Sequence, residues 1–95
     1  MPVMSVRVYA TLRDLAGGAH VDVPLDDGST AQELLHRLVK ECQELGAALL
    51  DGEGRLNAHM KMFVNGREVV YLDDAFGHVI QPTDTVDIFP PVGGG

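Results

Sequence analysis

Apolar and polar residues alternate along two segments near the start of the chain. Residues 3–12 place Val6 and Val8 on one side and Arg7 between them on the other, and residues 21–25 alternate in the same way. A period of two with many β-branched residues is typical of a strand with one buried face. The pattern therefore predicts two strands, paired as a hairpin across the turn region at Gly17-Gly18.

The next segment has the spacing of an amphipathic helix. Thr30 and Glu33 form the pattern of a capping box, in which each side chain bonds the backbone amide of the other residue. Apolar residues follow at intervals of three and four. They are Ala31, Leu34, Leu35, Leu38, Val39, Cys42 and Leu45. We expect this helix to end near Gly46, which can cap it.

Strand character returns after an irregular stretch. Residues 60–64 lead into Asn65-Gly66, the strongest short hairpin signal, and residues 67–71 are expected to form the returning strand. Residues 85–89 are predicted to be the last strand. In it, alternate positions put Val86 and Ile88 inward and Asp87 and Phe89 outward.

The predicted order is β-β-α-β-β-β, which is an α+β architecture. One amphipathic helix needs one sheet to cover, and a mixed sheet of about five strands curled around one main helix is the ubiquitin-like β-grasp arrangement. An α+β sandwich with another strand order fits the same pattern. We expect a β-grasp domain over residues 1–91 and a flexible, glycine-rich C-terminal tail over residues 92–95.

Charge and composition exclude several classes of function. The 95 residues include 14 acidic and 7 basic side chains, a net charge of −7, which opposes binding to nucleic acid or to an anionic membrane. Neither a signal peptide nor a membrane-spanning run is evident, and a single cysteine allows no internal disulfide. We therefore expect a cytoplasmic protein.

Side chains that could form an active site are scattered. His20, His36, His59 and His78 have no metal-ligand spacing, so no metal site is predicted. Cys42 lies on the apolar stripe of the predicted helix, where a thiol behaves as a small, inert hydrophobe. The sequence predicts no self-contained active site.

The C-terminal residues VDIFPPVGGG offer a different kind of chemistry. A terminal carboxylate becomes an acyl donor once an ATP-using enzyme adenylates it. Glycine has no Cβ, so a thread of glycines can enter a narrow active site, and Pro90-Pro91 would stiffen its exit from the domain. The alternative is a frayed terminus without function.

The tail Phe89-Pro90-Pro91-Val92-Gly93-Gly94-Gly95 closely resembles the C-terminus of the ThiS/MoaD family of ubiquitin-like sulfur carriers. Residues 8–13, 29–35 and 63–69 are also similar to that family, so the resemblance covers nearly the whole chain. Many molybdopterin-type carriers end in Ala-Gly-Gly, whereas this chain has Gly93 before the final pair.

The resemblance implies a carrier subunit that other enzymes act upon. An E1-like adenylating enzyme of the MoeB/ThiF type would activate Gly95 with ATP, and a cysteine desulfurase or rhodanese would supply sulfur, giving a thiocarboxylate. Gly93 and Gly94 would thread the tail, and no cofactor would be bound. The implied acceptor is an enzyme such as the large subunit of molybdopterin synthase. The candidate docking residues are Phe89, Pro90, Pro91 and Val92.

Other functions stay open at the level of sequence. Carriers for cysteine, thiamin or tRNA thiolation share this general pattern. A ubiquitin-like modifier would use the same acyl-adenylate chemistry to form isopeptide bonds through Gly95. A β-grasp interaction module with an idle tail is a third interpretation.

Overall fold

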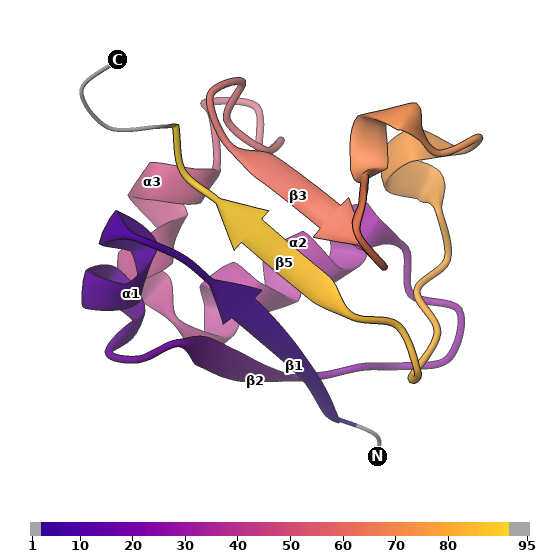
Figure 1. Cartoon of the computed structure of the whole chain (residues 1–95), viewed down its shortest axis with the longest axis horizontal. Coiled ribbons are helices and arrows are strands. Elements are labelled where there is room, and N and C mark those ends of the chain that lie inside the picture. Colours follow the sequence, from indigo (N-terminus) through magenta and orange to yellow (C-terminus); the bar gives the residue numbers. More distant parts are fainter. Residues whose placement is uncertain (1–2, 92–95) are drawn as a thin grey trace.

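The computed structural model describes residues 3–91 and contains one five-stranded mixed sheet (Figure 1). The strand order is β2-β1-β5-β3-β4; β1 and β5 are parallel, and the other neighbouring pairs are antiparallel. The strands are β1 (Val3–Val8), β2 (His20–Pro24), β3 (Lys61–Val64), β4 (Arg67–Glu68) and β5 (Val86–Phe89). The predicted β-grasp fold is confirmed.

Helix α2 (Ala31–Glu41) crosses one face of the sheet (Figure 1). Its capping box is present as predicted: the Glu33 amide donates to Thr30 Oγ1 at 3.2 Å, and the Thr30 amide donates to Glu33 Oε1 at 3.1 Å. These bonds satisfy donors that the first helical turn leaves free. Four apolar side chains of α2 are fully buried and Val39 is partly buried, so packing against the sheet stabilises the helix here.

The core lies between α2 and the inner face of the sheet. Side chains from the three central strands alternate into it, as a period of two requires. They are Val6 and Val8 of β1, Val86 and Ile88 of β5, and Met62 and Val64 of β3. The inward positions predicted for the last strand are thus confirmed.

The first predicted strand is too long. β1 ends at Val8, and Thr11–Ala16 forms a short helix, α1, so the prediction of a strand to residue 12 is wrong. Ala10 turns the chain between them with φ 54° and ψ −128°, a conformation that residues other than glycine rarely adopt. Leu12 lies in α1 and is fully buried.

The main helix ends earlier than predicted. α2 stops at Glu41, a 3₁₀ turn (Gln43–Leu45) follows, and Gly46 begins α3 (Gly46–Leu49) where we expected a cap. A Cβ on Gly46 would lie 3.0 Å from Cγ1 of Val39, so close packing accounts for the glycine. The break changes the path of the chain while Leu45 and Leu49 stay buried.

The second hairpin is present, with a shorter return than predicted. Asn65 and Gly66 have φ values of 53° and 82°, the left-handed backbone that favours these residues in a tight turn. β4 spans only Arg67–Glu68, and a 3₁₀ turn (Val69–Tyr71) replaces the rest of the expected strand and buries Val69. A further 3₁₀ turn (Ala75–Gly77) lies in the irregular stretch before β5.

Residues 50–56, which follow α3, fold back on themselves and are hydrogen-bonded to α2. Leu50 and Leu56 form an isolated antiparallel bridge, and both pack against the core. Within the loop, Asp51 Oδ1 accepts two backbone N–H groups, and these bonds lower the pKa of its carboxyl. The side-chain amide of Gln32 donates from Nε2 to the Gly54 carbonyl at 2.9 Å, which holds the loop against the helix.

Candidate functional site: the outward face at the tail

β5 is the central strand and delivers the chain to its C-terminal tail. It lies between β1 and β3, with Phe89 opposite Lys61 at its last position. Pro90 is half-buried and Pro91 is exposed. The predicted functional residues Val92, Gly93, Gly94 and Gly95 lie outside the described residues, and so does the predicted flexible tail.

Three aromatic rings meet on the outward face, beside the end of β5. The Phe89 ring stacks on Tyr9 with centroids 4.2 Å apart and planes 7° from parallel, and Phe63 meets Phe89 edge-on at 5.4 Å and 88°. We call Tyr9, Phe63 and Phe89 the aromatic cluster. The Arg13 guanidinium lies over the Tyr9 ring, 5.1 Å from its centroid. The edge-on contact of Phe63 with Phe89 is a geometry that aromatic pairs prefer, and the Tyr9–Phe89 pair is closely stacked.

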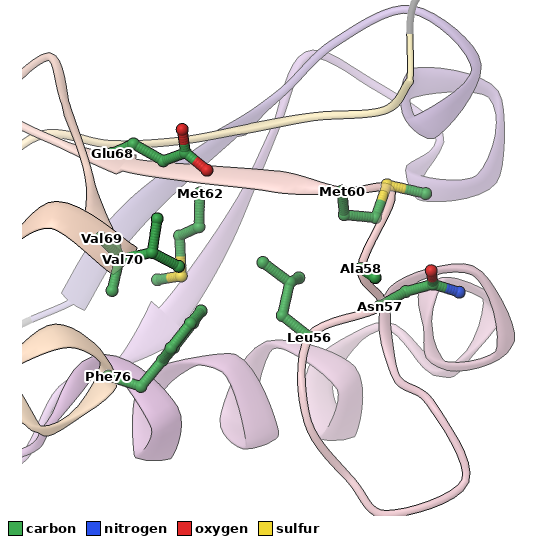
Figure 2. Close-up of a pocket in the computed structure, with 9 residues that line it drawn as sticks. All are labelled: Leu56, Asn57, Ala58, Met60, Met62, Glu68, Val69, Val70 and Phe76. Atoms are coloured by element: carbon green, nitrogen blue, oxygen red, sulfur yellow. The ribbon is translucent and has the colours of Figure 1, made fainter.

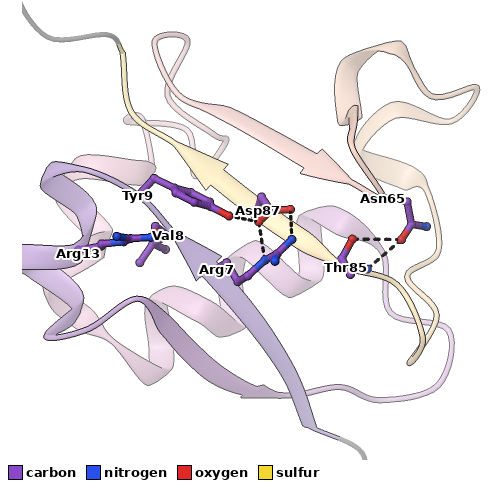
Figure 3. Close-up of polar contacts among 7 residues, drawn as sticks. All are labelled: Arg7, Val8, Tyr9, Arg13, Asn65, Thr85 and Asp87. Carbon is purple, nitrogen blue, oxygen red and sulfur yellow. Dashed lines mark hydrogen bonds and ion pairs between the residues drawn. The ribbon is translucent and has the colours of Figure 1, made fainter.

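A polar cluster of Arg7, Tyr9 and Asp87 adjoins the aromatic cluster (Figure 3). Tyr9 Oη donates to Asp87 Oδ1 at 2.6 Å, and Arg7 Nη2 donates to Asp87 Oδ2 at 3.0 Å. Arg7 Nε lies 2.7 Å from Asp87 Oδ1, which completes a two-pronged ion pair. The hydrogen bond to Asp87 raises the pKa of Tyr9, and it also raises the pKa of Arg7.

Asp87 differs from its sequence-based expectation in one respect. It points to the outward face as predicted, yet it is only 7% exposed, because Arg7 and Tyr9 cover it. The register explains the contact: Arg7 and Asp87 are direct partners across the parallel β1–β5 pair.

A shallow groove of about 280 Å³ lies beside the end of β5. Lys61, Phe63, Phe89, Pro90 and Pro91 line it. Three of the four predicted docking residues therefore share one surface, which joins the aromatic cluster to the start of the tail. Their docking role stays a prediction.

A second hollow lies on the other side of β3, between that strand and α2 (Figure 2). Its volume is about 100 Å³, and Phe89, Pro90 and Pro91 do not line it. The lining is mainly apolar and consists of Leu56, Asn57, Ala58, Met60, Met62, Glu68, Val69, Val70 and Phe76. It brings together none of the residues that the sequence singled out.

The remaining candidate residues show no convergent chemistry. Cys42 is buried as predicted, and burial raises the pKa of its thiol, which disfavours the nucleophilic thiolate. Within residues 3–91, no group of three or more His, Cys, Asp or Glu side chains is placed to hold a metal ion. Over the same residues, no helix is both long and apolar enough to span a bilayer.

Sequence reasoning missed most of the residues around Phe89. Tyr9, Phe63 and Asp87 have no predicted site role, although the alternation places Tyr9 and Asp87 on outward positions. The alternation does not give the register of strand pairing, and this register places Phe63 and Arg7 on either side of Asp87. A search for polar and aromatic residues at outward positions of the central strands would have found them.

The strand order and the single long helix packed on one face of the sheet define a ubiquitin-like protein. Its central strand leads directly into the C-terminal segment. The model of the ThiS family matches residues 6–95, and the chain belongs to that family. The resemblance inferred from the tail and the three internal segments is thereby confirmed.

Individual relatives cover nearly the whole chain. Small archaeal modifier protein 3 of Haloferax volcanii is 34% identical over 92 residues, which are 97% of this chain and 98% of the relative. The crystal structure of SAMP1 from Haloferax volcanii has a TM-score of 0.87 at 29% identity and covers 98% of this chain and 99% of that one. These similarities support assignment to the ubiquitin-like modifiers and sulfur carriers.

A further structural relative comes from an assembly of two proteins. A chain of the crystal structure of the Amycolatopsis orientalis BexX/CysO complex has a TM-score of 0.78 at 25% identity. The match covers 97% of this chain and 99% of that chain. A protein with this fold has thus been crystallised together with another protein.

Proposed function

We propose that this protein is a sulfur carrier and that the carboxylate of Gly95 is its reacting group. The observation that carries the proposal is the position of Phe89. It ends the central strand, packs on Tyr9 and Phe63, and lines the groove from which Pro90 and Pro91 lead into the tail. The rigid domain therefore holds the base of the tail beside a surface suited to docking.

The proposed chemistry is acyl activation followed by sulfur transfer. An E1-like partner joins the Gly95 carboxylate to the α-phosphate of ATP, and pyrophosphate leaves. The outer sulfur of a persulfide, supplied by a desulfurase or rhodanese, attacks the acyl-adenylate and displaces AMP, which gives an acyl disulfide. A second thiol of the partner then cleaves the S–S bond, so that the partner keeps a disulfide and the chain keeps a thiocarboxylate. ATP is consumed by the partner, so this chain needs no cofactor of its own.

The groove supplies the features of a protein interface. Phe63 and Phe89 offer apolar area in fixed orientations, which costs little conformational entropy on binding. Lys61 and the Arg7–Asp87 pair give this apolar surface a polar border. The activating enzyme and the sulfur acceptor would dock here in turn, with Val92, Gly93 and Gly94 entering their active sites.

Molybdopterin biosynthesis is the destination that we favour for the sulfur. The support is the Phe-Pro-Pro-Val tail with its final double glycine, Gly94-Gly95, which resembles molybdopterin-type carriers. Cysteine, thiamin and tRNA thiolation pathways are the alternative destinations. Identifying which acceptor enzyme takes up labelled sulfur from the charged chain would decide among them.

A second candidate function is that of a protein modifier. The specific support is the 34% identical relative from Haloferax volcanii, which is named a small archaeal modifier protein. In this function a lysine amine attacks the Gly95 acyl-adenylate, AMP leaves, and an isopeptide bond forms. The tail and the docking surface would serve both functions.

The test is the intact mass of the protein after co-expression with its host's adenylating enzyme. We expect a gain equal to the replacement of one oxygen by sulfur, localised to Gly95. A matched variant with one alanine appended after Gly95 should fold normally and show no gain. Sulfur incorporation into that extended variant, or none into the wild type under sulfur-replete conditions, would refute the proposal.

The modifier function has its own measurement. Lysine conjugates carrying the C-terminal peptide should be detected in cell extract by mass spectrometry, and they should disappear when Gly94 and Gly95 are deleted. If sulfur is incorporated and conjugates are absent, the chain is a carrier alone. If conjugates form without sulfur incorporation, the modifier function replaces it.

A further inference from the structure

The polar cluster is an unusual feature of the outward face. Asp87 is a charged side chain at the middle of the central strand, on the sheet face that α2 does not cover, and it is nevertheless almost completely buried. Two side chains cover it. Tyr9 Oη, Arg7 Nη2 and Arg7 Nε make three polar contacts with its carboxylate. Every contact comes from β1 or from the residue that follows it.

Stability alone does not account for this arrangement. Burying the Asp87 carboxylate costs desolvation. Its partner Arg7 has a side chain that is 53% exposed, and an ion pair with so exposed a partner adds little stability. A carboxylate instead fixes the positions of the groups that donate hydrogen bonds to it. In this fold the donor fixed by Asp87 is the Tyr9 hydroxyl, at the outer end of the ring that stacks on Phe89.

Tyr9 needs such a restraint because it follows the last residue of β1. Beyond Val8 the sheet register no longer holds the backbone, and Ala10 turns the chain away into α1. The Tyr9 ring is held instead by its hydroxyl on Asp87, by its face on Phe89, and by the Arg13 guanidinium above it. Figure 3 shows Arg7 of β1 and Tyr9, just after β1, converging on Asp87.

We propose that Asp87 is a positioning residue: by holding Tyr9 and Arg7 it fixes the Tyr9–Phe89 stack, and with it the orientation in which the groove meets a docking partner. The proposal rests on the function proposed above and names a determinant of partner recognition in it. Asp87 acts through Tyr9 and Phe89 and takes no part in the chemistry at Gly95. It should therefore alter recognition and leave the chemical step unchanged.

The first experiment needs no partner. In the full chain, NMR should show strong Overhauser contacts between the Tyr9 and Phe89 rings. Asp87→Ala and Tyr9→Phe should each weaken them, whereas Ser5→Ala, at an exposed outward position of β1 outside both clusters, should leave them intact. An Asp87→Ala chain with wild-type ring contacts would overturn the proposal.

The second experiment measures activation by the purified adenylating enzyme, through ATP–pyrophosphate exchange. Asp87→Ala should raise the KM for the chain roughly tenfold and leave kcat unchanged, a size typical of coupling between residues in contact. The double variant with Tyr9→Phe should be little worse than Asp87→Ala alone, because both changes remove the same bond. Equal losses in kcat and kcat/KM, or fully additive losses, would overturn the proposal.

A stability control separates positioning from general weakening. Val69→Ala removes buried side-chain volume in the core just after β4. Val69 belongs to neither cluster, so the change should lower the melting temperature without changing KM. If Val69→Ala raises KM as much as Asp87→Ala does, the effect is one of stability and the positioning role is wrong. If no adenylating enzyme accepts the wild-type chain, the proposed function fails, and the NMR comparison still decides whether Asp87 holds the stack.

Discussion

The two faces of β5 make different kinds of contact, although their residues alternate along a strand of only four residues. The inner face, Val86 and Ile88, enters a fully buried apolar core under α2. The outer face, Asp87 and Phe89, makes a few directed contacts: an ion pair, a phenol hydrogen bond and two ring contacts with defined angles. Neither outer side chain reaches the core.

The two kinds of contact suit the two faces to different roles. Hydrophobic burial is strong and has no preferred direction, so the inner face can hold the fold together while tolerating changes of shape. Hydrogen bonds and ring contacts contribute less energy and specify orientation. We therefore expect mutations of the inner side to change stability and those of the outer side to change recognition.

The largest effect should come from the inner side. Leu38 is fully buried on α2, and Leu38→Ala should lower the free energy of unfolding by about 2–5 kcal/mol, through lost apolar contact and the cavity left behind. Urea denaturation measures the change. Lys40→Ala, exposed on the same helix, is the matched control and should stay within about 0.5 kcal/mol of wild type. An unchanged midpoint for Leu38→Ala would contradict the assigned core face.

The outer side is tested most directly by Phe89→Ala. Phe89 is half-buried, so we expect a stability loss of about 1–2 kcal/mol, below that of a fully buried phenylalanine. Binding to the adenylating enzyme should fall at least about tenfold, as for an aromatic anchor at an interface. Phe76→Ala provides the control, since Phe76 is half-buried in the other hollow. If Phe89→Ala and Phe76→Ala weaken binding equally, the outer face has no special role in recognition.

Alkaline pH should weaken the outer side through Tyr9. The pKa of Tyr9 is raised in the folded state, so its contribution to stability is complete below the ordinary value of about 10 and is lost as pH rises through the folded value. Tyr9→Phe should therefore flatten the fall in unfolding free energy above pH 10. The raised pKa of Cys42 has the same sign and begins lower, so the comparison is best made in a Cys42→Ala background. A slope that Tyr9→Phe leaves unchanged would argue against the bond to Asp87.

The inner side was predictable from sequence because its signals are local. The capping box at Thr30 and the turn at Asn65-Gly66 each lie within a few residues, and both form as predicted. The polar cluster depends on residues 80 positions apart, Arg7 and Asp87, which meet only once the parallel register of β1 and β5 is known. A period of two can place a side chain outward, but it cannot name the partner that covers it.

The early end of β1 was missed for a related reason. Ala10 continues the apolar alternation of Val6 and Val8, so the pattern reads as one long strand. The residues Thr11 to Ala16 also fit a short helix that ends at Gly17, and only the sharp turn at Ala10 makes room for it. Alanine is a poor residue for that turn, so the sequence carries no signal there.

The smallest expected change in stability comes from relaxing the turn at Ala10. Ala10 adopts φ 54° and ψ −128°, where an L-residue is strained and glycine is not. Ala10→Gly should therefore raise the free energy of unfolding by about 1 kcal/mol, the relief of strain exceeding the added freedom of the unfolded chain. Urea denaturation measures it.

The control for this change is Ala47→Gly, at an exposed position of α3 with an ordinary helical backbone. There the same substitution should cost about 0.5–1 kcal/mol, so the two variants should move the midpoint in opposite directions. A relaxed turn could also loosen Tyr9, which precedes it. If Ala10→Gly stabilises the fold while raising the KM for activation, the strain itself helps to hold the outer face. If stability rises with recognition unchanged, Asp87 and the stacked ring of Phe89 suffice to hold Tyr9 in place.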